Sequence, residues 1–268
     1  MNRDCVWTFS GARLQKVGSM EKTPNWIFIP GGPGLGSECL FPLFSILDLP
    51  GTVWRLDLPG DGSNVSPENK ISNWPQALLE AANTFEDAIM AGHSRGGMFL
   101  QFLPELEKKI KGLVLMDAAP DKSWIEEFAA KIAHASTPEE SEYQKSPNNE
   151  TLRNFVLAGT PLMFTSEGLE KGRKSLENLP YNHQAIQWTQ EHFDPIYSAK
   201  WIPQEIPTLI LSGSEDLPTP LKLFSEKREY YRSNILMQEI KNAGHFPWIE
   251  NPAGVAAAFE EYCLKFFF

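Results

Sequence analysis

A serine between two glycines follows a short apolar run in the middle of the chain. Residues 88–97 read Ala-Ile-Met-Ala-Gly-His-Ser-Arg-Gly-Gly, which contains a Gly-x-Ser-x-Gly motif centred on Ser94, and a helix-forming segment from Met98 to Glu107 follows at once. Strand, tight turn and helix in this order are typical of a nucleophile elbow, a strained turn that exposes a serine hydroxyl at the head of a helix. Gly92 and Gly96 leave room where a Cβ would collide with a neighbouring element. The pattern predicts that Ser94 is a nucleophile rather than a serine of an ordinary glycine-rich turn.

A serine nucleophile needs a base that takes its proton and an acid that orients the base. His245 lies in Ala-Gly-His-Phe-Pro, a loop after an expected strand, and we predict that it is the base rather than a surface histidine. Asp216 follows the preceding expected strand and is the predicted acid. Asp117 ends the strand after the nucleophile helix and stays open as the alternative acid. Asp57 also ends a strand, but it precedes Ser94 and is interpreted as a structural turn residue.

The oxyanion of a tetrahedral intermediate needs two fixed hydrogen-bond donors. The backbone N–H of Arg95, the residue after the nucleophile, is one candidate. The turn Pro-Gly-Gly-Pro-Gly at 30–34 offers the other, with Gly32 expected and Gly31 as the alternative. We also predict a cis peptide between Gly32 and Pro33, which would hold the turn in shape. This turn lacks the following Lys-Ser/Thr of a phosphate-binding loop, so no nucleotide site is predicted.

The remaining histidines give no metal-binding pattern. His93 neighbours the nucleophile and is expected to pack away from it. His134, His183 and His192 lack metal-ligand spacing and are interpreted as surface residues. We therefore predict neither a metal site nor a cofactor.

Short apolar runs that alternate with helical segments surround these residues. Residues 5–18 are expected to form an antiparallel hairpin. The expected strands are 25–29, 52–58, 88–91, 111–116, 207–211 and 234–240, and the expected helices are 98–107, 220–230, one from a cap at Ser72 or Asn73 to about Glu86, and one after Pro252. This alternation predicts an α/β fold with a mostly parallel central sheet flanked by helices on both faces.

The strand rhythm stops between residues 120 and 202. Capping-box spacing, in which Ser123 is paired with Glu126 and Thr137 with Glu140, predicts that two helices begin there. We therefore predict one core domain formed by 1–119 and 203–268, interrupted by a helical insert at 120–202. Inserts above the carboxyl ends of parallel strands tend to cover the site, so this one is expected to act as a lid.

Bulk composition limits the classes of partner. The chain has 268 residues, is 42% hydrophobic and carries a formal net charge of −10, which argues against binding to nucleic acid or to an anionic membrane. The three cysteines form no Cys-x-x-Cys pair, the N-terminus lacks an apolar signal region, and no apolar run approaches the roughly 18 residues of a membrane span. A cytoplasmic protein that acts on a small molecule is expected. The sequence makes no prediction of its oligomeric state.

Together these motifs resemble the α/β-hydrolase superfamily over nearly the whole chain, in order and in spacing. The turn at 30–34 is similar to the His-Gly-Gly-Pro-Gly loop of proline iminopeptidases, although Pro30 replaces the first histidine. The elbow also departs from the Gly-Gly-Ser-Trp-Gly usual in that group. Gly-His-Ser-x-Gly is common among carboxylesterases, carbon–carbon bond hydrolases and acyl-carrier-protein methyl esterases. A serine at residue 94 argues against haloalkane dehalogenases and epoxide hydrolases, which use aspartate.

The resemblance implies a cofactor-independent serine hydrolase with an acyl-enzyme mechanism. A small carboxylic ester is the expected substrate, and carbon–carbon bond cleavage is a related possibility. One alternative is an aminopeptidase of the proline iminopeptidase type, in which glutamates of the insert would bind the substrate ammonium. Another, of a different class, is a non-catalytic binding protein on a hydrolase scaffold. Cofactor-free oxygen chemistry on the same scaffold is a third.

Overall fold

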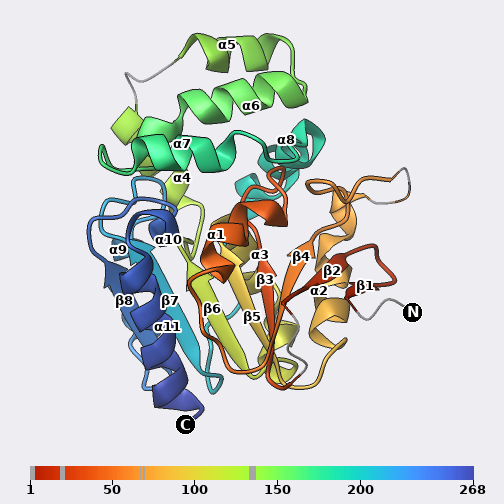
Figure 1. The fold of residues 1–268 in the computed structure, drawn as a ribbon, viewed down its shortest axis with the longest axis vertical. Coiled ribbons are helices and arrows are strands. Elements are labelled where there is room, and N and C mark those ends of the chain that lie inside the picture. Colours follow the sequence, from red (N-terminus) through yellow and green to blue (C-terminus); the bar gives the residue numbers. More distant parts are fainter. Residues whose placement is uncertain (1–3, 19–21, 67, 69, 133–136) are drawn as a thin grey trace.

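The computed structural model describes residues 4–18, 22–66, 68, 70–132 and 137–268. One eight-stranded sheet in the order β1-β2-β4-β3-β5-β6-β7-β8 runs through them (Figure 1). The strands are β1 (Cys5–Trp7), β2 (Arg13–Val17), β3 (Asn25–Ile29), β4 (Thr52–Asp57), β5 (Ala88–His93), β6 (Gly112–Met116), β7 (Thr208–Gly213) and β8 (Ile235–Ile240).

The sheet is parallel from β4 to β8, and only the first two strands are antiparallel to their neighbours. Every residue of β5, β6 and β7 is buried, as expected for parallel strands that are covered on both faces. The predicted fold class and the predicted hairpin at 5–18 are confirmed. Because parallel strands share a direction, the turns after β3, β5, β6, β7 and β8 all open at one edge of the sheet.

Helices cover both faces of this sheet and one of its ends. The α-helices are α1 (Phe41–Phe44), α2 (Trp74–Ala82), α3 (Arg95–Gln101), α4 (Ser123–Ile132), α5 (Pro138–Lys145), α6 (Asn149–Ala158), α7 (Leu169–Leu176), α8 (His183–His192), α9 (Lys222–Ser225), α10 (Pro247–Glu250) and α11 (Pro252–Phe266). Short 3₁₀ helices are η1 (Ser37–Leu40), η2 (Ile71–Asn73), η3 (Pro104–Lys108), η4 (Thr160–Leu162), η5 (Asp194–Ile196) and η6 (Arg228–Tyr230).

Two apolar clusters form the core, one on each face of the sheet. The first contains Leu78 of α2, Phe99 of α3 and Leu223 of α9. The second contains Leu43 of α1 and Phe259 of α11. A sheet held from both sides in this way is a rigid base for the turns at its carboxyl edge.

Helices α5 to α8 form a layer above the carboxyl ends of the strands (Figure 1). At the base of this layer a β-bridge pairs Asp121 with Ser198. The division into a core at 1–119 and 203–268 and an insert at 120–202 stays a prediction. Within the described ranges, no helix is both long enough and apolar enough to cross a membrane.

Some predicted helix boundaries were wrong. The helix expected to end near Glu86 ends at Ala82, and it follows the turn η2, so neither Ser72 nor Asn73 caps it with a side chain. Nucleophile helix α3 begins at Arg95 rather than Met98 and ends before Pro104, which begins η3. Proline cannot continue the hydrogen-bond ladder of a helix, which explains the break.

The two predicted capping boxes had different outcomes. Ser123 lies inside α4, and its backbone N–H donates to the Asp121 carboxylate at 3.0 Å, so Ser123 is not the cap. Thr137 accepts from the backbone N–H of Glu140 at 3.2 Å, as predicted. The segment 220–230 forms α9 and η6 rather than one helix.

Candidate active site

Ser94 lies at the sharp turn between β5 and α3. Its backbone has φ 51° and ψ −125°, a conformation that costs a non-glycine residue energy and is typical of a functional turn. A Cβ on Gly92 would lie 2.6 Å from the carbonyl carbon of Gly96, so a side chain there would collide with backbone. The Ser94 N–H donates to the carbonyl of Met116 at 2.8 Å, which ties the turn to the next strand. These features are those of the predicted elbow.

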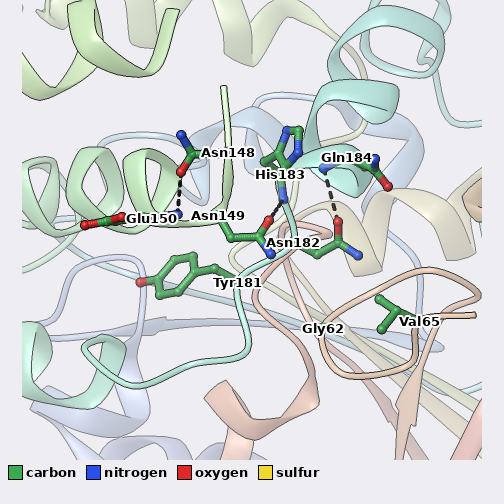
Figure 2. Close-up of a pocket in the computed structure, with 9 residues that line it drawn as sticks. All are labelled: Gly62, Val65, Asn148, Asn149, Glu150, Tyr181, Asn182, His183 and Gln184. Atoms are coloured by element: carbon green, nitrogen blue, oxygen red, sulfur yellow. Dashed lines mark hydrogen bonds between the residues drawn. The ribbon is translucent and has the colours of Figure 1, made fainter. Parts of the chain in front are cut away.

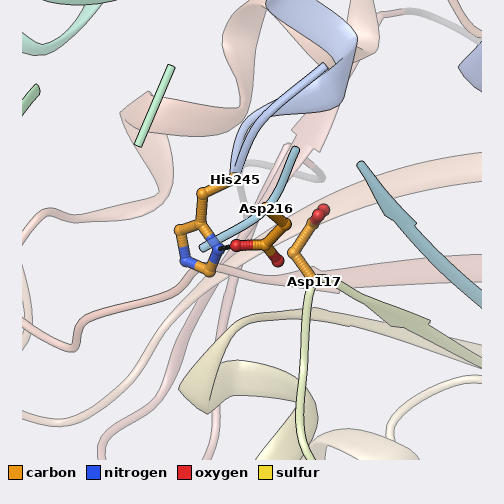
Figure 3. Close-up of side chains that lie close together, drawn as sticks. All are labelled: Asp117, Asp216 and His245. Atoms are coloured by element: carbon orange, nitrogen blue, oxygen red, sulfur yellow. Dashed lines mark hydrogen bonds and ion pairs between the residues drawn. The ribbon is translucent and has the colours of Figure 1, made fainter. Parts of the chain in front are cut away.

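His245 and Asp216 form a hydrogen-bonded pair at the same edge of the sheet. Nδ1 of His245 lies 3.1 Å from Oδ1 of Asp216, and both side chains are buried (Figure 3). Asp216 lies in the turn after β7, and His245 lies in the loop between β8 and α10. An acid on Nδ1 leaves Nε2 of the imidazole free to accept a proton, which is the arrangement a general base requires.

His93 connects this pair to the nucleophile turn. Nε2 of His93 lies 2.9 Å from the carbonyl oxygen of His245, and the two rings have centroids 4.8 Å apart. Burial and the neighbouring His245 lower the pKa of His93 to about 3, so this imidazole is neutral. His93 is therefore a packed residue, as expected from the sequence. No hydrogen bond joins the hydroxyl of Ser94 to His245 in the described chain, and that contact stays a prediction.

Four hydrogen-bond donors surround the carboxylate of Asp216. Oδ1 accepts from His245 and from the backbone N–H of Thr219 at 3.2 Å. The hydroxyls of Thr219 and Ser212 lie 2.8 and 3.2 Å from Oδ2. Burial raises the pKa of Asp216, but His245 and the donors from Thr219 outweigh it, and the net pKa lies below the usual value. Asp216 is thus ionised and oriented, as a triad acid must be.

Asp117, the alternative acid, lies on the side of Asp216 that is away from His245 (Figure 3). Its Oδ1 accepts from the N–H of Gly213 at 2.9 Å, and its Oδ2 has no partner among the described residues. Burial and then the charge of Asp216 raise the pKa of Asp117 well above its usual value, which disfavours its charged form. The structure shows hydrogen bonding between His245 and Asp216, and none between His245 and Asp117 in the described chain.

Potential ligand atoms of Asp117, Asp216 and His245 lie within 4.8 Å of one another. A cation there would have to displace the donors from His245, Thr219 and Ser212 that already occupy the Asp216 carboxylate. We therefore interpret the cluster as part of a catalytic triad and not as a metal site.

The glycine turn after β3 passes directly over the nucleophile. A Cβ on Gly31 would lie 2.8 Å from Cβ of Ser94 and 2.8 Å from Nδ1 of His93, so glycine is required for this approach. Gly32 has φ 111°, and the Gly32–Pro33 peptide is cis, as predicted. The turn is thus close enough to place a backbone donor beside Ser94, the role predicted for Gly32.

A buried carboxyl group holds the far side of this turn. Oδ1 of Asp61 accepts from the N–H of Gly34 at 2.6 Å, while its buried Oδ2 has no partner among the described residues. Burial and the nearby Asp57 raise the pKa of Asp61 to about 7. Asp57 binds Arg13 and the backbone N–H of Ser37, the structural role expected for it.

Because the pKa of Asp61 is raised on folding, the folded protein binds the extra proton between about pH 4 and pH 7. Its contribution to stability should therefore fall as pH rises through this range and stay low above it. Asp61→Asn removes the ionisation, so the variant should be more stable relative to the wild type at pH 8 than at pH 5. The difference between the two free energies of unfolding measures this. Urea unfolding at both pH values gives that difference, with the exposed Asp48→Asn as the control. A relative stability that does not change with pH would contradict the assignment.

Sequence reasoning missed the side chain of Arg95, having considered only its backbone N–H. The Arg95 guanidinium pairs with Asp194, at the start of η5, through Nε to Oδ1 at 2.9 Å and Nη2 to Oδ2 at 2.7 Å. Nη1 donates to the carbonyl of Gly32 at 3.2 Å. Nothing in the local sequence marks Asp194, since the two residues are 99 positions apart. The predicted nucleophile turn, oxyanion turn and insert therefore meet at one cation.

A polar groove lies between the helical layer and the core, away from the triad. It has a volume of about 450 Å³, and Figure 2 shows its lining: Gly62, Val65, Asn148, Asn149, Glu150, Tyr181, Asn182, His183 and Gln184. Asn182, the N-cap of α8, also binds the core, since its backbone N–H donates to the carbonyl of Gly34 at 2.8 Å. His183 is partly exposed at this groove and His192 is exposed at the end of α8, whereas His134 lies outside the described residues.

Comparison with known proteins agrees with this architecture. Residues 26–258 match a family model described as the alpha/beta hydrolase family. No curated protein matches the chain in sequence.

Several solved structures share the fold at low identity. A proline iminopeptidase-related protein of Thermus thermophilus has a TM-score of 0.74 at 19% identity, with 99% of each chain covered. A thermophilic esterase of Thermogutta terrifontis has a TM-score of 0.67 at 17% identity, with 100% of each chain covered. An epoxide hydrolase of Bacillus megaterium has a TM-score of 0.66 at 16% identity, covering 97% of this chain and 99% of the other. At such identities these likenesses establish the fold alone.

Proposed function

The chain belongs to the alpha/beta hydrolase family, and we propose that it is a serine hydrolase that cleaves a small carboxylic ester through an acyl-enzyme at Ser94. The observation that carries this proposal is the buried His245–Asp216 pair at the edge of the sheet where the strained Ser94 turn lies. An ordinary glycine-rich turn would need neither the strain nor the pair. The substrate is a small molecule, and the chemistry needs no cofactor.

In the proposed reaction, Oγ of Ser94 attacks the carbonyl carbon of the ester while Nε2 of His245 accepts the hydroxyl proton. The resulting oxyanion is bound by the N–H groups of Arg95 and Gly32. The intermediate then expels the alcohol, which takes the proton from His245. Water attacks the acyl-enzyme with His245 again as the base, so the acid is released and Ser94 regains its proton. Asp216 stabilises the imidazolium at both steps.

The helical layer above the strands supports the proposal that residues 120–202 form a lid over this site. In that role the lid would exclude water from the acyl-enzyme until product leaves. Trp124 of α4 lies under the Arg95 guanidinium, 5.0 Å from ring centroid to Cζ, and is thus one lid residue beside the nucleophile turn.

The aminopeptidase alternative requires a free carboxylate that binds the substrate ammonium. Asp194 is the buried acid among residues 137–202, and it is paired with Arg95 at 2.7 Å. An acid already neutralised by a guanidinium is a poor ammonium ligand. This pairing removes Asp194 as the ammonium ligand, and the aminopeptidase alternative then depends on the glutamates of the insert.

Hydrolysis of para-nitrophenyl acetate and of a prolyl-arylamide, each by the wild type and by Ser94→Ala, tests the substrate class. We expect Ser94-dependent release of para-nitrophenol and no Ser94-dependent release of the arylamine. The reverse result would assign the protein to the aminopeptidases. A fluorophosphonate probe that fails to label Ser94 would instead favour the non-catalytic binding protein.

A further inference from the structure

The Arg95 side chain makes more contacts around the nucleophile than packing alone requires. Its guanidinium forms a two-point ion pair with Asp194, and the two side chains are only 14% and 9% exposed. Its Cζ lies over the ring of Trp124, 5.0 Å from the ring centroid. A guanidinium that is bound by a carboxylate through two nitrogens and also contacts an aromatic ring has little conformational freedom.

The remaining nitrogen of this fixed guanidinium reaches the oxyanion turn. Nη1 donates to the carbonyl of Gly32 at 3.2 Å. Among the described residues, no other donor binds that carbonyl. Gly32 has no side chain and a φ of 111°, so rotation about its backbone is easier than for other residues unless its carbonyl is anchored. Such rotation would move the Gly31–Gly32 peptide, which carries the Gly32 N–H. The next anchor along the turn is Gly34, which is held by Asp61 and by Asn182.

Resting on the proposed serine-hydrolase function, we propose that Arg95 is a positioning residue whose guanidinium, fixed by Asp194 of the insert, anchors the Gly32 carbonyl. This anchor on one side of Gly32 would hold the preceding Gly31–Gly32 peptide, which carries the Gly32 N–H, beside the oxyanion. The insert thereby contributes to transition-state stabilisation without touching the substrate. Preorganised donors act by being in place before the charge develops. A more mobile Gly32 should therefore reduce the stabilisation of the transition state more than it reduces the binding of the substrate.

The test compares Arg95→Met, Arg95→Lys and Asp194→Asn with the wild type. The matched control is Arg55→Met, because Arg55 is 13% exposed, pairs with Glu38 at 3.0 Å and lies over Phe41 at 4.9 Å, but does not bind Gly32. For each protein we would measure kcat and KM on para-nitrophenyl acetate, the affinity for a trifluoromethyl ketone, the rate of fluorophosphonate labelling and the melting temperature.

We expect Arg95→Met to lower kcat and the labelling rate about 10- to 100-fold, since one complete oxyanion donor is worth about 10²–10³. KM should change less than about threefold, while the trifluoromethyl ketone should lose affinity in parallel with kcat. Arg95→Lys should resemble Arg95→Met, because an ammonium cannot make the three contacts at once. Added ethylguanidinium should partly restore an Arg95→Ala variant.

The proposal is overturned if Arg95→Met keeps kcat and the labelling rate within twofold of the wild type. It is also overturned if Arg55→Met causes the same loss, since activity would then follow stability alone. If wild-type Ser94 takes up no fluorophosphonate, the serine-hydrolase function fails and this inference with it. Normal wild-type labelling with unaffected Arg95 variants removes the inference only.

Discussion

Ser94→Ala should lower kcat for para-nitrophenyl acetate by about 10⁵- to 10⁶-fold, to the background that binding and the oxyanion donors alone sustain. The loss is this large because the three members of a triad act as a unit, so removing the nucleophile removes the acyl-enzyme route altogether. Alanine lacks only the hydroxyl and fits the same turn. Initial-rate kinetics measure the activity, and thermal unfolding checks that the elbow still folds.

Ser175→Ala is the matched control for this variant. Ser175 is a serine of α7 whose hydroxyl donates to the carbonyl of Gly172 at 2.6 Å, within the helical layer and away from the triad. Its turnover and its labelling by a fluorophosphonate should equal those of the wild type. If Ser94→Ala retained a tenth or more of the wild-type kcat, another group would be the nucleophile.

The residues of the candidate triad could be predicted from sequence because each lies at a strand end that local pattern marks. Buried apolar runs define β5 and β7 and a partly buried run defines β8, and in a parallel sheet the turns after them share an edge. The sequence pattern therefore predicts Ser94, Asp216 and His245 at this edge. The sequence left Asp117 open as the acid, and the contacts to His245 distinguish the two.

The hydrogen-bond environment of the site was not predictable in the same way. Thr219 and Ser212 hold Asp216, but a serine or threonine in a loop gives no sign of which carboxylate it will face. The pairing of Arg95 with Asp194 joins the first residue of helix α3 to the predicted insert. It depends on how the insert packs, which residue order does not encode locally.

Helix ends differed for a similar reason. Ser72 and Asn73 are residue types typical of N-caps. The chain, however, enters α2 through the 3₁₀ helix η2, and neither side chain forms a capping hydrogen bond. Thr137, in contrast, is the N-cap of the mostly exposed helix α5, and there the capping pattern predicts the bond that forms. Local signals hold where tertiary contacts do not compete with them.

The strongest discrimination within the triad comes from two isosteric changes. Asp216→Asn should lower kcat by about 10⁴-fold, because an amide neither stabilises the imidazolium nor holds Nδ1 of His245 as the protonated nitrogen. Asp117→Asn should leave kcat within about threefold of the wild type. Burial and Asp216 raise the pKa of Asp117 well above the usual value and so disfavour its charged form. An asparagine oxygen can still accept from the N–H of Gly213.

Each variant thus serves as the control of the other, since both remove one carboxyl group from the same buried cluster. Steady-state kinetics on para-nitrophenyl acetate measure the contrast, and the rate of fluorophosphonate labelling follows Ser94 independently of the substrate chosen. A loss confined to Asp117→Asn would transfer the acid role to the strand after the nucleophile helix. Equal losses in both would mean that the two carboxyl groups share one proton and titrate as a pair, so neither could be assigned the role alone. Asp216 is hydrogen-bonded to His245, whereas no hydrogen bond joins Asp117 to His245 in the described chain, so we expect the loss in Asp216→Asn and not in Asp117→Asn.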